Sequence, residues 1–290
     1  MKLSEMRALL RERNLRLTRS LGQNFLHDAN QLRRIVALAE LAPGDAVLEI
    51  GPGLGPLTER LLAADCRVLA IEQDARLVAW LRERWPAEPR LTLEQADAVA
   101  WLRAHPRDWS EWRLVANLPY SVASVLLVDF ALAPDPPARL VVTVQREVAC
   151  RLTAAPATPD YGLLTLLVGA RYQPAGRFAV PANCFFPPPK VASTCLRLDR
   201  RPEPLLPPAL LPEYRALVKC AFGQRRKKML KLLKQRWPEE RLRAALAALD
   251  LSPDLRAEKV RPEQFARLTE LLAAPDSAPS ATRAHDSSAS

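Results

Sequence analysis

The chain has no apolar run long enough to cross a membrane. Its longest apolar stretch, Val122 to Ala133, is interrupted by Asp129 and falls far short of the roughly 20 residues that a transmembrane helix needs. The first twenty residues are basic, contain Glu5 and Glu12, and lack the apolar segment and cleavage site of a secretory signal. We therefore expect a cytoplasmic protein with no membrane partner.

Cysteine is scarce and is not arranged to bind a metal. No Cys-x-x-Cys pair and no histidine at zinc-finger spacing accompany the five cysteines, which are Cys66, Cys150, Cys184, Cys195 and Cys220. A disulfide framework or a zinc site is not indicated by such spacing. We expect reduced, mostly structural thiols and no metal.

Positive charge, by contrast, is in excess. The 290 residues include 42 Lys and Arg against 32 Asp and Glu, which gives a formal net charge of +10. This excess favours a polyanionic partner or an acidic surface without choosing between them. The length allows one full α/β domain and a smaller second domain, and we find no internal repeat.

Strand-like runs alternate with helix-like runs through the first half of the chain. The strand-like runs are almost continuously apolar and span Ala46–Ile50, Arg67–Ile71, Leu91–Gln95, Leu114–Asn117 and Leu140–Gln145. Segments with helical spacing lie between them, at Leu57–Ala64, Ala75–Arg84, Val99–Ala104 and Val122–Leu132. This alternation predicts an α/β fold, a Rossmann-like doubly wound parallel sheet with ligands at the carboxyl ends of its strands.

The pattern changes after about Asp199. Four closely spaced prolines precede only helical segments, which are Pro212–Phe222, Arg226–Gln235, Pro238–Leu249 and Pro262–Ala273. We predict an α/β domain of residues 1–200, which begins with a basic segment of residues 1–28, and a small all-helical domain of residues 201–274. The Ser- and Ala-rich tail, 275–290, is expected to be disordered.

A glycine-rich turn follows the first strand of this pattern. Gly51, Gly53 and Gly55 lie between that strand and the next helix, where glycine lets the backbone approach a ligand and the helix N-terminus offers unpaired N–H groups. A dinucleotide fingerprint is G-x-G-x-x-G, whereas the spacing here is G-x-G-x-G. The loop therefore fits the first motif of S-adenosylmethionine methyltransferases better than an NAD site, and we assign Gly51 and Gly53 to the cofactor.

Two acids end the next two strands. Glu72 closes the second strand, 21 positions after Gly51, where a carboxylate can accept hydrogen bonds from both ribose hydroxyls. Asp97 follows the third strand and would accept from the exocyclic amine of the cofactor's adenine. The alternatives are a solvated acid at position 72 and an ordinary helix N-cap at position 97.

Asn117-Leu118-Pro119-Tyr120 follows the fourth strand and suits an aromatic amine as substrate. The N6 lone pair of adenine is delocalised, so two acceptors, the Asn117 side-chain oxygen and the Leu118 carbonyl, would aim it at a methyl group. Pro119 would fix the turn, and Tyr120 would stack on the base. The alternative is an ordinary turn with a half-buried tyrosine, and the neighbouring strand ends favour the pocket.

Four further segments carry a resemblance to a known family. They are Leu21-Gly22-Gln23-Asn24-Phe25-Leu26, Val144-Gln145-Arg146-Glu147-Val148-Ala149, Asp160-Tyr161-Gly162 and Phe185-Phe186-Pro187-Pro188-Pro189-Lys190-Val191. In this order they resemble the KsgA/RsmA family of 16S ribosomal RNA adenine dimethyltransferases and, more distantly, the Erm 23S enzymes. The resemblance implies dimethylation of N6 on two adjacent adenosines near the 3′ end of 16S rRNA during small-subunit biogenesis, with S-adenosylmethionine as methyl donor. It also implies an rRNA-recognition role for the helical domain, and we expect a monomer.

The resemblance also assigns residues to the site. The positions that match cofactor-binding residues are Asn24, Leu26, Gly51, Glu72, Asp97 and Asn117. Tyr120 matches the base-stacking tyrosine, and Phe186 resembles the aromatic residue that closes the other face of the base. Core packing is the alternative for Phe185 and Phe186, and we expect one of the two to do only that.

Two local features leave alternatives open. Ser121 stands where the family usually has Asn, and we expect it to cap the following helix. For Gln145-Arg146-Glu147, a structural ion pair and an RNA contact are equally good accounts. The rival functions are an Erm-type 23S methyltransferase and a non-catalytic assembly factor that binds precursor small subunits.

The segment from Gln224 to Lys234 holds six basic residues and no acid. On a helix, Met229, Leu230, Leu232 and Leu233 would turn inward and the lysines would spread outward. We predict phosphate contacts from Arg225, Arg226, Lys227, Lys228 and Lys231, which would supply salt-dependent RNA affinity. A merely solvated face is the alternative.

Overall fold

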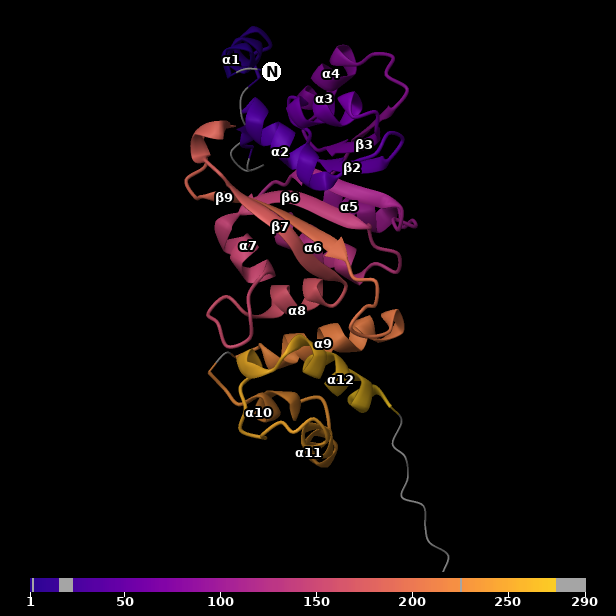
Figure 1. The fold of residues 1–290 in the computed structure, drawn as a ribbon, viewed down its shortest axis with the longest axis vertical. Helices are drawn as coiled ribbons and strands as arrows, with labels where there is room; N and C mark the ends of the chain where they lie inside the picture. The colour runs from indigo at the N-terminus through magenta and orange to yellow at the C-terminus, as the bar shows by residue number, and fades with distance from the viewer. Residues whose placement is uncertain (2, 16–22, 225, 275–290) are drawn as a thin grey trace, which may run out of the picture.

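The computed structural model of the protein describes residues 1, 3–15, 23–224 and 226–274. The predicted disordered tail, Arg225 and the first two residues of the Leu21–Leu26 segment lie outside these residues. Figure 1 shows an elongated molecule, with helix α1 (Leu3–Glu12) at one end, a central sheet, and the helices of the C-terminal part at the other end. No described helix is both long enough and apolar enough to cross a membrane.

A seven-stranded sheet forms the centre of the molecule, in the order β4-β3-β2-β5-β6-β9-β7. Its strands are β2 (Ala46–Ile50), β3 (Arg67–Glu72), β4 (Leu91–Gln95), β5 (Trp112–Asn117), β6 (Arg139–Gln145), β7 (Tyr172–Val180) and β9 (Ser193–Arg200). The five strands predicted from the sequence are all present and pair in parallel. The doubly wound fold class is thereby confirmed.

At one edge, the sheet extends beyond the five predicted parallel strands. Strand β9 pairs antiparallel with both β6 and β7, and neither β7 nor β9 was predicted. Strand β7 is at the edge and carries Pro174 and Gly176, where the register shifts. Proline and glycine weaken a strand pattern in the sequence, but an edge strand tolerates them because one of its sides needs no partner.

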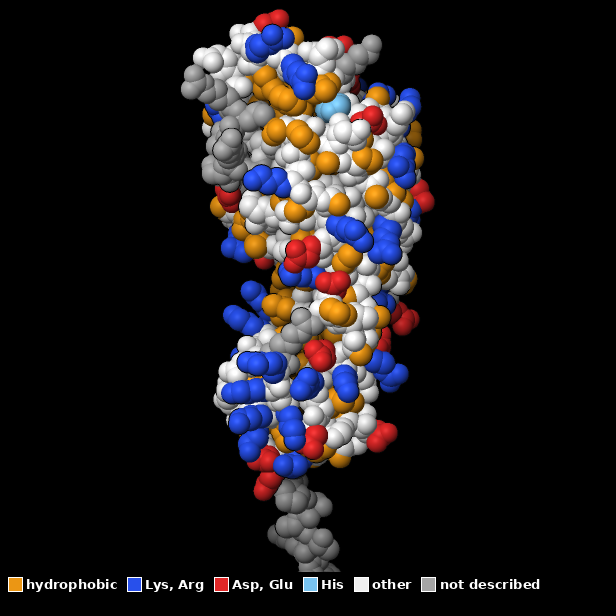
Figure 2. Space-filling view, turned by 90° about the vertical axis from the view of Figure 1, so that its left-hand side faces the viewer, with side chains coloured by type: hydrophobic (Ala, Val, Ile, Leu, Met, Phe, Trp, Pro, Cys, Tyr) orange, Lys and Arg blue, Asp and Glu red, His pale blue; other side chains and the backbone are white. Residues whose placement is uncertain are grey.

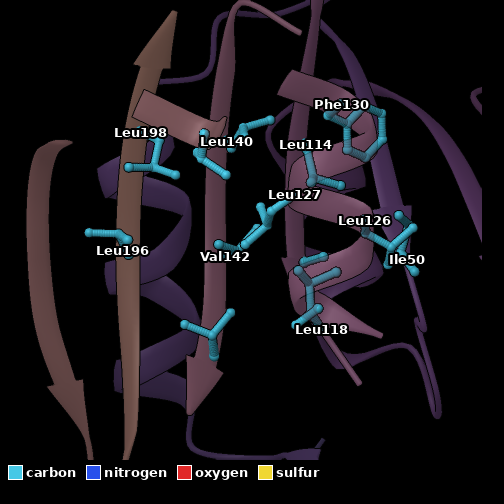
Figure 3. Packing of buried hydrophobic residues seen from close by; sticks show 14 of the residues in the cluster. Ile50, Leu114, Leu118, Leu126, Leu127, Phe130, Leu140, Val142, Leu196 and Leu198 are labelled. Atoms are coloured by element: carbon cyan, nitrogen blue, oxygen red, sulfur yellow. The ribbon is translucent and has the colours of Figure 1, made fainter. Parts of the chain in front are cut away.

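Helices cover both faces of the sheet. They are α2 (Ala29–Ala39), α3 (Pro56–Ala63), α4 (Ala75–Arg84), α5 (Ala98–Ala104), α6 (Ala123–Leu132), α7 (Arg146–Leu152) and α8 (Leu163–Gly169). Residues of α2 and α3 share one hydrophobic cluster with one face of the strands. Residues of α5, α6 and α7 pack on the other face. Figure 3 shows Leu126, Leu127 and Phe130 of α6 against Leu114 of β5 and Val142 of β6.

The C-terminal helices form a core of their own. Helices α9 (Leu211–Ala221), α11 (Glu239–Ala248) and α12 (Pro262–Ala273) agree with the prediction to within one residue at each end. The short 3-10 turns η3 (Pro208–Leu210) and η4 (Ala257–Lys259) belong to this part, whereas η2 (Ala182–Cys184) follows β7 in the sheet part. Tyr161 connects this core to the sheet part, since its hydroxyl donates a hydrogen bond of 2.7 Å to the Val260 carbonyl and its ring packs on Phe222.

The helix predicted at Arg226–Gln235 is much shorter than expected. Helix α10 spans only Met229–Leu233, and Lys228 before it is extended and makes no side-chain cap hydrogen bond. Consecutive cations at a helix N-terminus oppose the helix dipole, which accounts for the late start. The predicted faces are nevertheless correct, because the four apolar residues are buried while Lys227, Lys228, Lys231 and Lys234 are exposed.

Candidate active site

A cavity of about 300 Å³ lies at the carboxyl ends of the parallel strands. The sequence-predicted residues that line it are Asn24, Gly51, Gly53, Glu72, Asp97, Asn117, Leu118, Pro119 and Tyr120. They come from four strand ends and from the segment before β1 (Phe25–Leu26). The structure therefore brings together nearly all of the predicted site in one place, as parallel strands covered by helices would require.

The glycine-rich turn is shaped for close approach. Gly53 has a φ of +61°, and a Cβ atom on it would lie 2.7 Å from the ring of Phe25. Gly51 has a φ of +70°, and a Cβ on it would lie 3.3 Å from the ring of Pro119. Side chains are strained at such φ values and would also fill this space. Glycine is thus needed where the turn meets both Phe25 and the Asn117–Tyr120 segment.

Glu72 is buried, with 7% of its surface exposed, at the end of β3. Its Oε2 accepts from the backbone N–H of Gly53 at 3.1 Å, and its Oε1 accepts from that of Asp74 at 2.9 Å. Burial raises the pKa of the Glu72 carboxyl, and these two N–H groups act in the opposite direction. Each carboxylate oxygen has capacity for a further hydrogen bond toward the cavity.

Asp97 fits both interpretations that the sequence allowed. Its side chain caps helix α5, where Oδ1 accepts from the Ala100 N–H at 2.8 Å. The same residue lines the cavity. The cap fixes the carboxylate at the mouth of the cavity, so capping and ligand binding are compatible at this position.

Asn117 places an unsatisfied acceptor in the site. Its Nδ2 donates to the Asn24 carbonyl at 2.9 Å, which orients the side chain. Its Oδ1 is buried and has no hydrogen-bond partner among the described residues. A buried polar atom without a partner costs about 1–3 kcal/mol. The geometry is therefore that of an acceptor that awaits a donor from a ligand.

Tyr120 is half-buried, and its hydroxyl lies 2.5 Å from Ser193 Oγ. Burial raises the pKa of the Tyr120 hydroxyl, and the hydrogen bond with Ser193 partly offsets this. Ser193 is on β9, which the sequence did not predict, so this partner was missed. The contact holds the ring at the wall of the cavity.

Ser121 does not cap the helix that follows it. The N-cap of α6 is Val122, with no side-chain cap hydrogen bond. The backbone N–H groups of Val122 and Ala123 instead donate to the Pro119 carbonyl at 3.2 Å, so the turn itself begins the helix. Ser121 lines the cavity.

Two predicted residues lie outside the cavity lining. Leu26 is buried on β1 opposite Phe185 of β8 (Phe185–Phe186), and Phe185 is the core residue of the phenylalanine pair. Phe186 is half-buried opposite Phe25, and the Arg7 guanidinium lies over its ring, 5.2 Å from the centroid. Phe186 does not line the cavity that Tyr120 lines, and its predicted place across a base from Tyr120 stays a prediction.

Glu49 is a buried acid close to the glycine-rich turn, and the sequence reasoning did not consider it. It is 1% exposed in the middle of β2, and its Oε2 accepts from Thr58 Oγ1 at 2.7 Å. Burial raises the pKa of the Glu49 carboxyl to about 8. An acid inside an otherwise apolar strand is the signal that would have found it.

The basic residues lie in the C-terminal part, away from the cavity. Arg226, Lys227, Lys228 and Lys231 are exposed around α10, and Lys228 pairs with Asp254 at 2.7 Å. In Figure 2, Lys and Arg side chains gather over the lower part of the molecule, where α9 to α12 lie. We call Arg226, Lys227, Lys228 and Lys231 the basic cluster.

The structure also describes the Gln145-Arg146-Glu147 segment and the cysteines. In the Gln145-Arg146-Glu147 segment, Glu147 forms an ion pair with Arg151, one turn further along α7, so the structural account applies to this acid. All five cysteines are free. Among the described residues, no group of three or more His, Cys, Asp or Glu side chains is placed to hold a metal ion.

The fold and the site define a class of protein. A doubly wound sheet, a Gly-x-Gly-x-Gly turn after one strand, an acid at the end of the next and an Asn-Leu-Pro-Tyr turn at one cavity are typical of S-adenosylmethionine-dependent methyltransferases. The family model described as ribosomal RNA adenine dimethylase matches residues 14–274. The chain belongs to this family, which confirms the predicted family, enzyme class and methyl donor.

Individual relatives agree with this assignment. The chain is 42% identical over 262 residues to ribosomal RNA small subunit methyltransferase A of Gloeobacter violaceus, covering 88% of this chain and 93% of the relative. It is 38% identical over 278 residues to the protein of the same name from Phenylobacterium zucineum, covering 96% and 95%.

Solved structures show the same fold. The 23S rRNA methyltransferase ErmE is 34% identical with a TM-score of 0.64, covering 86% of this chain and 99% of that chain. A dimethyladenosine transferase from Plasmodium falciparum has a TM-score of 0.71 at 23% identity, covering 84% and 95%.

Proposed function

We propose that the protein transfers methyl groups from S-adenosylmethionine to N6 of two adjacent adenosines near the 3′ end of 16S rRNA, during assembly of the small subunit. The observation that carries this proposal is the buried Oδ1 of Asn117 at the cavity, which has no hydrogen-bond partner in the described part of the chain. An exocyclic amine supplies the N–H donor that this atom lacks. The names of the relatives support the small subunit as substrate.

The residues around the cavity suit the cofactor. Glu72 would accept hydrogen bonds from the ribose hydroxyls of the cofactor, and Asp97 would accept one from its adenine amine. Gly51 and Gly53 carry no side chains, so the cofactor can approach the backbone of the turn. Asn24, whose carbonyl orients Asn117, and Leu26 support this wall from β1 and the segment before it. When bound, the cofactor supplies a sulfonium methyl group, which is a strong electrophile.

The other residues of the site would orient the target amine. Asn117 Oδ1 and the Leu118 carbonyl would accept from its two N–H groups, so that the nitrogen lone pair faces the methyl group. Pro119 holds the turn, and Tyr120 stacks on the base. Most of the rate enhancement would then come from orientation and pre-aimed dipoles, and the proton leaves after transfer without a strong base.

The helical part would recognise rRNA. We place its boundary near residue 201, behind a methyltransferase domain of residues 1–200, and assign phosphate contacts to the basic cluster and to Arg225 beside it. In Figure 1 its helices lie at one end of the molecule, beyond the central sheet, which suits a substrate that extends well beyond the target base. We further expect a monomer that acts in the cytoplasm, where small subunits assemble.

One observation favours a second candidate. The similarity to ErmE makes methylation of 23S rRNA the rival activity. The experiment that separates the two supplies labelled cofactor with unmethylated small subunits or with unmethylated 23S rRNA, and identifies the modified nucleosides by mass spectrometry. We expect N6,N6-dimethyladenosine at two adjacent positions near the 3′ end of 16S rRNA.

The same assay has an internal control. Asn117→Ala should abolish methylation of small subunits, because the amine loses its acceptor. Label confined to 23S rRNA would establish the rival activity. Binding of small subunits without methyl transfer would instead indicate a non-catalytic assembly factor.

A further inference from the structure

A second cavity lies next to the active site, at the N-terminal end of the molecule. It has a volume of about 510 Å³ and is lined by Arg7, Leu10, Arg11, Leu15 and Phe186. Four of these residues belong to α1 or follow it directly, and the fifth is on β8. Figure 2 shows apolar and basic side chains beside one another at the end of the molecule where α1 lies.

This second cavity adjoins the active site through one pair of residues. Phe25 lines the active-site cavity, and Phe186 lines the second one. The two residues are directly opposite each other in the antiparallel β1–β8 pair, and strands in such a pair lie about 5 Å apart. Both side chains also belong to the apolar cluster under α1. The Phe25–Phe186 pair is therefore the common wall of the two cavities.

The lining combines an aromatic ring with two positive charges. Arg7 and Arg11 are one helical turn apart, so they lie on the same face of α1, and both side chains are exposed. Neither guanidinium forms an ion pair with an acid in the described part of the chain. The Phe186 ring lines the cavity, and the Arg7 guanidinium lies over this ring, 5.2 Å from its centroid.

We propose that this cavity is a second nucleotide subsite, which holds the nucleotide adjacent to the target adenosine while the target base occupies the active site. The adjacent base takes the place of the Arg7 guanidinium on the Phe186 ring, and Arg7 and Arg11 bind its phosphate. Aromatic stacking with arginine contacts to the backbone is the usual chemistry of single-stranded RNA sites. This subsite deepens the proposed function and rests on it.

The subsite accounts for two features. The subsite explains why Phe186 lies beyond the wall of the active-site cavity, since the Phe186 ring stacks on the base next to the target base. It also suits a substrate with two adjacent adenosines, because one is held in the subsite while the other reacts. A peptide partner fits less well, because the two guanidinium groups, which form no ion pair within the described residues, call for an anionic ligand.

The test pairs a change in the protein with a change in the RNA. Small subunits are reconstituted with 16S rRNA that carries an abasic residue in place of the adenosine adjacent to the target. With the wild-type enzyme, the KM for these subunits should rise by about five- to a hundredfold, the range that base–aromatic stacking spans. With Phe186→Leu, native and abasic subunits should have the same, raised KM. An abasic effect that persists in Phe186→Leu would overturn the subsite.

A second variant tests the phosphate contact without touching the core. Arg7→Ala/Arg11→Ala removes two exposed side chains and should raise the KM for native subunits about tenfold or more, with cofactor affinity unchanged by calorimetry. Arg82→Ala, an exposed arginine of α4, is the matched control and should behave as wild type. An unchanged KM in the double variant would also overturn the subsite. If the wild-type enzyme methylates no small subunit at all, it is the proposed function that fails.

Discussion

The backbone N–H of Gly53 donates a hydrogen bond to Oε2 of Glu72 across a distance of 3.1 Å. This bond ties the glycine-rich turn after β2 to the acid at the end of β3, so the two cofactor motifs of the sequence form one unit. The turn cannot shift without loss of this bond. Changes at Glu72 should therefore alter both the ribose contact and the shape of the turn.

Replacement of Glu72 by alanine should weaken cofactor binding by about 1.5–3 kcal/mol, the range for hydrogen bonds to a charged group. Isothermal titration calorimetry with S-adenosylmethionine measures this change. Glu94→Ala, which removes an acid of β4 that does not line the cavity, is the matched control. Equal affinity of Glu72→Ala and wild type would remove Glu72 from the cofactor site.

Two substitutions of Tyr120 separate its ring from its hydroxyl. Tyr120→Phe keeps the ring and loses the hydrogen bond with Ser193, so kcat/KM for small subunits should fall by about tenfold or less. Tyr120→Ala also loses stacking on the base and should cost about 1–3 kcal/mol more. Steady-state methylation assays measure both.

Ser193→Ala gives the control for this pair. It removes the same hydrogen bond from the other side, so it should match Tyr120→Phe, and the double variant should be no worse than either single variant. Equal losses in Tyr120→Phe and Tyr120→Ala would contradict a stacking role for the ring.

The basic cluster should bind RNA through its unpaired lysines. Lys227 and Lys231 form no ion pair with a described acid, whereas Lys228 pairs with Asp254. Lys227→Ala/Lys231→Ala should weaken RNA binding and flatten the plot of log K against log salt by about 0.7–0.9 per lysine. Filter binding or fluorescence anisotropy at several salt concentrations measures the slope.

The control for this variant removes two arginines at the opposite end of the molecule. Arg60→Ala/Arg82→Ala changes the net charge equally, on α3 and α4, and should leave the slope nearly unchanged. A slope that is the same in wild type and in Lys227→Ala/Lys231→Ala would make the cluster a solvated face.

The residues of the active-site cavity could be predicted from the sequence because each of them has a recognisable place beside a predicted strand. Gly51, Glu72, Asp97 and Asn117 each follow an apolar strand, and the carboxyl ends of parallel strands meet at one edge of the sheet. Chain order and strand period were therefore sufficient to bring these residues together. No knowledge of long-range packing was required.

Features that depend on distant packing were not predictable in this way. Tyr120 meets Ser193 only because β9 inserts antiparallel between β6 and β7, and the alternation in β9 does not reveal its neighbours. The surroundings of Phe186 were not predictable for the same reason, since they depend on the β1–β8 pair and on α1. Glu49 was missed because a motif search examines the glycines and not the strand before them.

Glu49 should make the stability of the protein depend on pH. The pKa of its carboxyl is raised to about 8 by burial, so the folded state holds a neutral acid at pH 7 while the unfolded chain is ionised. Its contribution to stability is therefore complete below the ordinary pKa of about 4.3 and is lost as the pH rises toward 8. The loss is about 1.4 kcal/mol for each pH unit within this window.

Glu49→Gln removes the ionisable group and keeps an oxygen that can accept from Thr58. The free energy of unfolding is measured with urea from pH 5 to pH 9 for this variant and for wild type. The variant's value minus the wild-type value should increase up to about pH 8 and stay constant at higher pH. Glu240→Gln, which replaces an exposed acid of α11 in the same way, is the matched control. Parallel curves for Glu49→Gln and wild type would show that Glu49 is ionised in the folded state, and its burial beside Glu72 would then need a counter-charge.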